Sequence, residues 1–352
     1  MKRLSIASIL GFSLVLTSYA TSRTPDKAVL EAKALREAEE KLREFVPTLS
    51  ALEKRFSEDP EVLLGLATIY SHYSPDFEYS KRCALLYRKA VALEPSNKAA
   101  RIGLVQRVVG DFMSQRGQLL LALEFKQQFA MRENLKEVEI DIPWDDELYK
   151  LLCDLLREQG QEKIVIRDFN EARVRLCENF DRTKLPTVMA ELEKAEKFEP
   201  GNAVYNYLRA QLYFDLDEDE RGLEELQKGS RKPYFNTYVI ETAAARNRVI
   251  REVGFPENYR RTIEENLPLP WGIPAEPKVF MIAKQEQERG NPKKAIEIYE
   301  AMIRIENQYN EEPIPGKAGQ PPGRQRDRNL SYPFGRMARQ QLAKIRPEQG
   351  IR

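Results

Sequence analysis

Histidine is almost missing from this chain, which has a single one, His72, among 352 residues. Catalytic triads and most zinc sites need histidine as a base or ligand, so its scarcity argues against both. A glycine-rich phosphate loop, a GxSxG elbow, a zinc-binding helix and a CxxC pair are also missing. We therefore expect a protein that is not an enzyme and that holds no metal and no cofactor. Carboxylate chemistry stays open, because paired acids leave no sequence signature.

The chain also lacks an excess of charge of either sign. Its 56 basic and 55 acidic residues leave a net charge of +1. Such a balance creates no overall field that would favour nucleic acid, so we expect no nucleic-acid partner. A hydrophobic content of 42% with 32% charged residues is typical of a helix-rich globular protein.

Long hydrophobic runs are absent except at the N-terminus. Leu4–Leu16 is mainly apolar, follows Lys2 and Arg3, and precedes the small-x-small pattern of Ser18, Tyr19 and Ala20. This pattern predicts a signal peptide over 1–20 and an exported chain, periplasmic or extracellular. The alternative is an uncleaved signal that anchors the chain in the membrane.

Cysteine is scarce as well, with three residues in the chain. Cys153 and Cys177 fall on predicted helices that could be neighbours, and an oxidising compartment would permit a disulfide between them. The plainer interpretation is that Cys83, Cys153 and Cys177 are small residues on apolar stripes.

What the sequence does have is clearest over Pro277–Glu306. Apolar residues recur there every three or four positions on both sides of Gly290, as expected for two amphipathic helices. Gly290 can close the first helix in a left-handed conformation, and Pro292 suits the first turn of the second. The stripes comprise Val279, Ile282 and Ala283, then Ala295, Ile298, Tyr299 and Met302. Such a helical hairpin cannot bury its stripes alone and needs copies of itself.

The rest of the chain can be divided by the same patterns. We expect N-terminal helices over 21–58 with a break near Pro47, hairpins over 59–134 and 147–231, and a closing helix with a basic tail over 333–352. Lys98–Arg116 and Gln118–Asn134 are predicted as two helices separated by Gly117. Lys163–Phe180 and Leu185–Phe198 are also predicted as separate helices. Three stretches break the helical pattern: an extended excursion at 135–146, a helix with a proline-rich connector at 232–276, and a proline- and glycine-rich loop at 307–332.

These units resemble tetratricopeptide repeats, helical hairpins of about 34 residues. The unit at Pro60–Asn97 matches through Leu63, Leu66, Ala67, Tyr70, Tyr87, Ala90 and Pro95. The unit at Asn202–Gly229 matches through Ala210, Tyr213, Gly222, Leu226 and Gly229. The unit that opens at Pro277 departs from the pattern at Glu286, where tyrosine is expected, and at Asn307, where a proline is expected. The resemblance implies an all-α fold, an α-solenoid whose helical hairpins stack into a right-handed superhelix.

In that family the residues beside the stripe on each first helix face a concave groove. By resemblance, the groove would be lined by Leu64, Thr68 and His72, by Tyr207, Gln211 and Asp215, and by Phe280, Lys284 and Glu288. This mixture suits an extended peptide or a helix of a partner protein. The plainer interpretation is that these are ordinary exposed positions, or positions covered by neighbouring segments.

Two charged stretches could be functional, but each also has an ordinary structural explanation. Asp215–Asp219 is acidic, but a calcium loop would need glycine at 220 and a carboxylate at 226, where Glu220 and Leu226 stand. Acids at the start of a helix favour its dipole. The basic tail from Arg324 onward could touch an anionic envelope surface, or form a solvated surface.

The sequence thus favours an exported scaffold or adaptor of the cell envelope that binds a protein or peptide in its groove. The alternatives are a self-assembling structural component, hence a homo-oligomer, and a carboxylate-based cell-wall or glycan enzyme.

Overall fold

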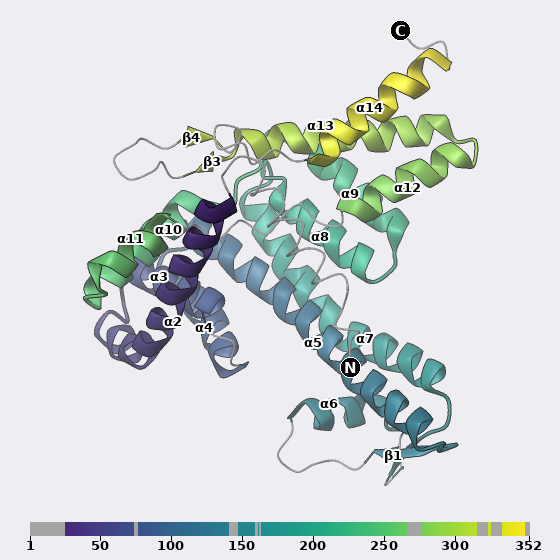
Figure 1. Ribbon diagram of the computed structural model, residues 1–352, viewed down its shortest axis with the longest axis horizontal. Helices are drawn as coiled ribbons and strands as arrows, with labels where there is room; N and C mark the ends of the chain where they lie inside the picture. The colour runs from purple at the N-terminus through teal and green to yellow at the C-terminus, as the bar shows by residue number, and fades with distance from the viewer. Residues whose placement is uncertain are drawn as a thin grey trace. The chain divides into compact units, whose positions relative to one another are not determined.

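The structure, a computed structural model, describes residues 25–73, 77–140, 147–158, 161, 163–265, 276–314, 323–324 and 333–348. These residues form thirteen helices, α2 to α14, and two short two-stranded sheets (Figure 1). The predicted all-α class is confirmed. The chain divides into two compact units, and each unit is built from more than one stretch of the sequence. The predicted signal at 1–20 and the proline run at 267–274 lie outside the described residues.

Unit 1 is made of five helices from two distant stretches of sequence. They are α2 (Pro25–Arg55), α3 (Pro60–Tyr73), α4 (Phe77–Leu93), α10 (Val239–Glu252) and α11 (Glu257–Glu265). Helix α3 packs between α4 and α10, and α11 packs on α2. Gly65 permits the close approach of α3 to α10, since a Cβ there would lie 2.2 Å from the carbonyl oxygen of Ala245.

The start of α3 is tied to α10 by charge. Asp59 accepts hydrogen bonds from the backbone N–H groups of Glu61 and Val62, as a helix N-cap does. Its other oxygen accepts a bond of 2.5 Å from Arg248 on α10. Partial burial opposes the charge of Asp59, yet the Val62 N–H and the Arg248 guanidinium hold its pKa below the usual value.

Two expectations for unit 1 differ from the structure. The predicted break near Pro47 is absent, because α2 continues through it to Arg55. Leu49 and Leu52 are buried directly beyond the proline, so packing of that turn offsets the lost hydrogen bond. Helix α11 had no predicted counterpart, since its single buried apolar side chain, Ile263, leaves almost no stripe to read.

Unit 2 begins with a long helical pair. Its elements are α5 (Lys98–Arg132), β1 (Val138–Ile140), α6 (Glu147–Leu156), β2 (Ile164–Ile166) and α7 (Phe169–Phe198). Helix α5 starts at the N-cap Asn97, whose side chain accepts from the N–H of Ala100 at 2.9 Å. Helices α5 and α7 pack along one another, and α6 packs on both. The antiparallel strands β1 and β2 pair Val138 with Ile166.

Here the sequence led to three wrong boundaries. Helix α5 is one helix of 35 residues and not two helices parted at Gly117. A Cβ at Gly117 would meet nothing within 4 Å, so this glycine is merely tolerated inside a helix. Ile164–Ile166 is a strand and not the start of a helix. Helix α7 runs through Pro186, with Phe180 and Val188 buried on either side of it.

The second half of unit 2 holds two helical hairpins and a further helix. These are α8 (Val204–Asp215) with α9 (Asp219–Ser230), α12 (Glu276–Glu288) with α13 (Pro292–Glu311), and α14 (Pro333–Glu348). Helix α13 packs against α9, α12 and α14, so the elements lie in series (Figure 1). The strands β3 (Pro313–Ile314) and β4 (Gly323–Arg324) form the second sheet.

The turn between α12 and α13 has the geometry expected from Gly290. Its φ is +81°, in the region where glycine avoids the strain of a side chain. Val279, Ala283, Ala295, Ile298 and Tyr299 are all buried. Glu286, which interrupts the first stripe, is buried too and accepts a hydrogen bond of 2.9 Å from Asn291 in the turn.

Helix α14 buries Ala338, Leu342 and Ile345. Gly335 lets it approach α13, because a Cβ there would meet the Glu306 carboxylate at 2.4 Å. Met337, an apolar residue of the same helix, is 37% exposed. It lies one position before the buried Ala338, on the edge of the packed face.

Candidate functional site

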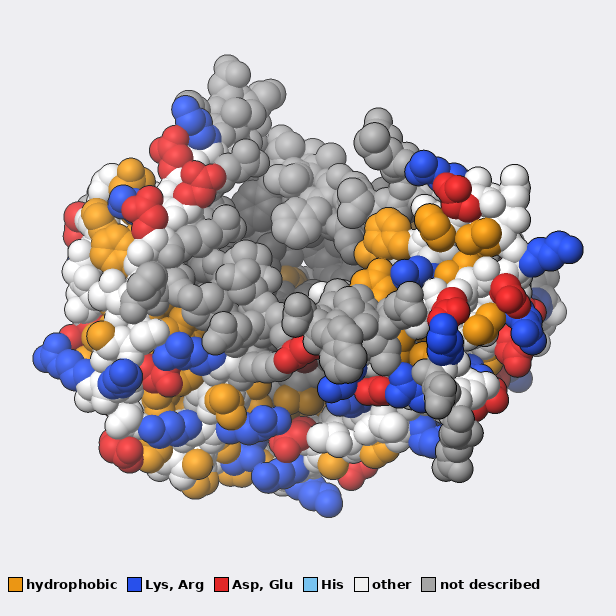
Figure 2. Space-filling model, turned by 90° about the horizontal axis from the view of Figure 1, so that it is seen from below, with side chains coloured by type: hydrophobic (Ala, Val, Ile, Leu, Met, Phe, Trp, Pro, Cys, Tyr) orange, Lys and Arg blue, Asp and Glu red, His pale blue; other side chains and the backbone are white. Residues whose placement is uncertain are grey.

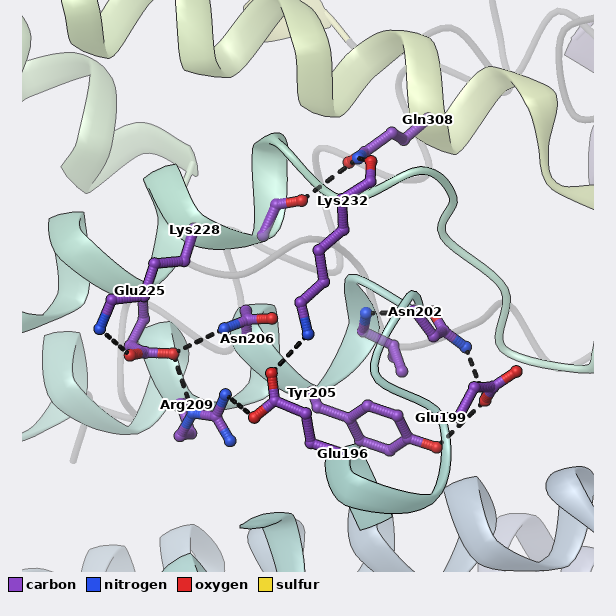
Figure 3. Close-up of polar contacts among 12 residues, drawn as sticks. Glu196, Glu199, Asn202, Tyr205, Asn206, Arg209, Glu225, Lys228, Lys232 and Gln308 are labelled. Carbon is purple, nitrogen blue, oxygen red and sulfur yellow. Dashed lines mark hydrogen bonds and ion pairs between the residues drawn. The ribbon is translucent and has the colours of Figure 1, made fainter.

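A buried ion network surrounds Arg209 in the middle of α8 (Figure 3). Its Nε donates to Glu225 on α9 at 2.8 Å, and its Nη2 pairs with Glu196 on α7. Glu225 also accepts bonds of 2.8 Å from Asn206 and Lys228. Burial alone would raise the pKa of Glu225, but these donors lower it to about 2. The ion pairs of Arg209 with Glu196 and Glu225 therefore join α7, α8 and α9.

A second buried carboxylate, Glu199, lies at the turn from α7 to α8 and is 3% exposed. Its oxygens accept from Lys98, Asn202, Tyr205, Tyr234 and Tyr238. These bonds hold the pKa of Glu199 below its usual value in spite of burial. The tyrosines respond in the opposite sense: burial and the adjacent carboxylate raise the pKa of Tyr234 to about 12 and that of Tyr238 further.

The segment 231–238 is fastened to both hairpins. Asn202 is fully buried, donates to the carbonyl of Asn236 at 2.8 Å and accepts from its N–H at 3.1 Å. The buried Glu312, at the end of α13, accepts from the N–H and hydroxyl of Thr237. Gln308 on α13 donates to the carbonyl of Lys232 at 2.7 Å (Figure 3). These bonds lock the first hairpin to the second.

The chemistry of these groups is that of a structural network. Each oxygen of Glu196, Glu199 and Glu225 already accepts at least one charged or hydroxyl donor from the fold. A general base needs a lone pair free for substrate and a pKa near the working pH, whereas Glu199 and Glu225 have lowered values. Sequence reasoning missed this network. Its signal was Arg209 and Asn206 standing among the apolar residues of α8.

The predicted groove positions of unit 1 lie on α3. Leu64 is 2% exposed and Thr68 is fully buried, with its hydroxyl donating to the Leu64 carbonyl at 2.9 Å. Helix α3 packs against α2, α4 and α10, and neither side chain offers surface to a partner. The side chain of His72 lies outside the described residues.

On α8, the predicted groove position Tyr207 is also buried, at 2% exposure. Its ring packs on Phe235 at 5.8 Å between centroids, and its hydroxyl donates to Gln308. Gln211 is half-buried and donates to the exposed Asp215 at 2.8 Å. The 231–238 segment thus covers the centre of α8 and leaves only its C-terminal end open.

The predicted positions on α12 remain the most accessible. Lys284 and Glu288 are exposed and pair loosely at 3.7 Å, and Phe280 is half-buried against Tyr299 with ring centroids 5.8 Å apart. Met281, one position from Phe280, is 50% exposed. Helix α12 is brought to α8 by Lys278, which donates to the carbonyl of Phe214 at 2.7 Å. We call the α8–α12 face the set formed by the half-buried Gln211 and the exposed Asp215, Met281, Lys284 and Glu288.

Two adjoining hollows lie on the other side of the second hairpin. One, of about 400 Å³, is lined by Glu300, Ile303, Arg304, Arg339, Leu342 and Ala343. The other, of about 300 Å³, shares Glu300 and Arg304 and adds Gln227, Arg231 and Glu297. Arginines and glutamates are mixed in both, so neither presents a field of one sign. Over the face drawn in Figure 2, too, the described basic and acidic side chains are interspersed.

Three further findings concern metal binding, membrane spans and the cysteines. Within the described residues, no cluster of three or more His, Cys, Asp or Glu side chains could hold a metal ion. None of the described helices is long and apolar enough to cross a membrane. None of Cys83, Cys153 and Cys177 forms a disulfide within the described residues, and Cys83 donates to the carbonyl of Ala67 at 3.3 Å. Burial raises the pKa of Cys177.

Comparison with known proteins returned no match: no family model, no curated protein and no solved structure is similar to this chain.

Proposed function

We propose that this chain is an exported scaffold of helical repeats related to the tetratricopeptide type, which binds a segment of another protein on its α8–α12 face. The observation that carries the proposal is the serial packing of α8–α9, α12–α13 and α14, with exposed side chains on α12 that the fold does not use. Two hairpins in series are how a solenoid builds a continuous surface. Export is proposed from the N-terminal sequence alone.

The chemistry of the face suggests the kind of segment that it would accept. Met281 offers a flexible apolar side chain, and methionine adapts to partners of varied shape. Lys284 and Glu288 pair with each other, at 54% and 64% exposure, and no ion pair to another described residue holds them. A partner segment with one apolar anchor flanked by charges of both signs would satisfy all three. In the same proposal, the exposed Arg336 and Lys344 of α14 belong to a basic end that touches anionic surfaces.

The test is site-specific photo-crosslinking in the native cell fraction. A photoreactive amino acid at Met281 should capture a defined protein, and the same group at Val174 on α7, which is 56% exposed, should not. The adduct at 281 should disappear when Lys284 and Glu288 are changed to alanine. The matched control changes Arg173 and Glu178 to alanine and should leave it intact. An adduct that survives the first change, or equal adducts at both sites, would contradict the proposal.

The carboxylate enzyme has no comparable support. The buried acids Glu199 and Glu225 and the half-buried Glu196 are engaged within the fold, and the acids of the hollows, Glu297 and Glu300, lie beside arginines in shallow surface depressions. Self-assembly is supported by a separate observation, the exposed apolar residues of α5, which the next subsection describes.

A further inference from the structure

The outward face of α5 carries a regular seam. Ser114, Gln118, Leu121, Phe125, Gln128 and Arg132 follow one another at alternating steps of four and three residues, and all six are exposed. This is the spacing by which one helix packs along another. We call these six residues the α5 seam.

The seam lies opposite the side on which α5 packs in its own unit. Leu119, Leu123 and Ala130 are buried, and at 100° per residue they point away from Leu121 and Phe125. Helices α6, α7 and α8 all pack on α5. Within the part of the chain that the structure describes, the α5 seam is therefore a helix-packing face that carries no helix.

The exposed apolar area along this face is large. Leu121 is 43% exposed and Phe125 58%, and at its edge Phe129 is 53% and Met131 72% exposed. Single exposed apolar residues are common, but Leu121, Phe125 and Phe129 lie within about 80° of one another around the helix and form a patch, with Met131 on the opposite edge of the seam. A contiguous patch of this kind marks an interaction surface.

The order of residues identifies the occupant. Read in either direction, the α5 seam has a polar end, a glutamine, two apolar residues, a glutamine and a polar end. Two antiparallel copies of the helix would set Leu121 against Phe125 of the second copy, and Gln118 against Gln128. In a two-fold contact, residue i meets j and j meets i, and this pattern satisfies that condition.

Charge at the ends of the seam agrees with the same arrangement. Arg132 is 85% exposed, and in the antiparallel register it faces Ser114 of the second copy. Asp111 lies one helical turn before Ser114 and is partly exposed. Arg132 would thus approach, at both ends of the contact, the Asp111 carboxylate, which already pairs with Arg107 of its own helix. Small side chains at Ser114 and Gly117 leave room for it, since a Cβ at 117 would meet nothing within 4 Å.

We propose that two copies of this chain form an antiparallel, two-fold dimer through the α5 seam. The seam spans about 27 Å of helix, which places the contact at the small end of stable protein interfaces. The dimer should therefore dissociate at micromolar concentration. The proposal does not depend on the function assigned to the α8–α12 face.

Sedimentation of the full chain across a concentration series tests the dimer. The mass should rise from that of one chain to that of two, and Phe125→Glu should keep the protein monomeric at the highest concentration. Val174→Glu, at a residue of similar exposure on α7, should leave the dimer unchanged. Because Arg132 is 85% exposed, Arg132→Glu cannot disturb the core, and it should weaken the dimer about tenfold. A wild-type protein that stays monomeric, or a dimer unaffected by both seam variants, would overturn the proposal.

Disulfide trapping tests the direction of pairing. In a Cys177→Ala background, Leu121→Cys and Phe125→Cys chains should cross-link with each other faster than either does with itself. A parallel dimer would reverse that order. Cross-linking that is equal in all mixtures would show a contact without this register and would also overturn the proposal.

Discussion

Helices α3 of unit 1 and α8 of unit 2 are the first helices of two similar hairpins, yet they are buried in different ways. Along the middle of α3 the fit is steric. Gly65 lets the backbone of α10 approach closely, and every residue from Val62 to Tyr70 is buried. Around α8 the fit is electrostatic, with Arg209 and Asn206 inside the core and bound to Glu196 and Glu225. One repeat pattern thus leads to two cores with different weaknesses.

The largest expected loss of stability comes from a glycine packed against backbone, and a smaller loss comes from a glycine packed against a side chain. Gly65→Ala would place a Cβ 2.2 Å from a carbonyl oxygen of α10, which cannot rotate away, and should lower the free energy of unfolding by about 3 kcal/mol. Gly222→Ala on α9 meets the ring of Phe214 at 2.6 Å, and this ring can turn, so about 1 kcal/mol is expected. Hydrogen exchange of α3 and α9 amides measures both. A larger loss for Gly222→Ala would reverse the comparison.

The contacts of Glu225 beside α8 should respond to pH, whereas the close approach of Gly65 on α3 to α10 should not. The folded pKa of Glu225, about 2, is below its ordinary value of 4.5, so its contribution is present above pH 4.5 and is lost as pH falls towards 2. Glu225→Gln should cost about 2 kcal/mol at pH 7, since the amide keeps part of the bonding. That cost should shrink as the pH falls below 4.5. Denaturation of both proteins from pH 7 to 3 provides the check. The cost of Gly65→Ala should stay constant, and a parallel decline would contradict the assignment.

A smaller effect is expected where neither kind of core is involved. Gly290 in unit 2 and Gly254 in unit 1 both have positive φ, +81° and +68°, with open space around them. Alanine at either should cost about 1 kcal/mol through backbone strain alone. Thermal unfolding of the two variants should show similar losses. A loss at one site only would mean that its surroundings matter beyond the turn.

The smallest change is expected on the open face of α12. Lys284→Ala removes a side chain that is 54% exposed, so the unfolding free energy should move by less than about 0.5 kcal/mol. The photo-crosslink from Met281 should nevertheless weaken. A stability loss beyond that range would assign Lys284 to the fold and not to binding.

Much of the fold was readable from the sequence because helical stripes are local. The apolar spacing around Gly290 predicted where Val279, Ala295 and Tyr299 would be buried, and they are. Continuity was harder to read. Gly117 and Pro186 look like boundaries in isolation, but packing of the flanking turns carries α5 and α7 through both.

The site was less predictable, for a related reason. Leu64 and Tyr207 occupy positions that the repeat pattern turns towards a groove. Whether they reach solvent depends on α10 and on the segment 231–238, which lie far along the chain from the helices that they cover. Lys284 and Glu288 are exposed because no described segment returns to cover them.

By itself, then, the sequence determined the helical class and the positions of the hairpins α3–α4, α8–α9 and α12–α13, since these follow from spacing, turns and caps within a few residues. Tertiary structure alone decided which faces are covered. It placed Ala245 against Gly65, joined Arg209 to Glu225, and left the α5 seam bare. Burial is set by segments that are distant in the sequence, and local periodicity shows only that a face is apolar, not what lies on it.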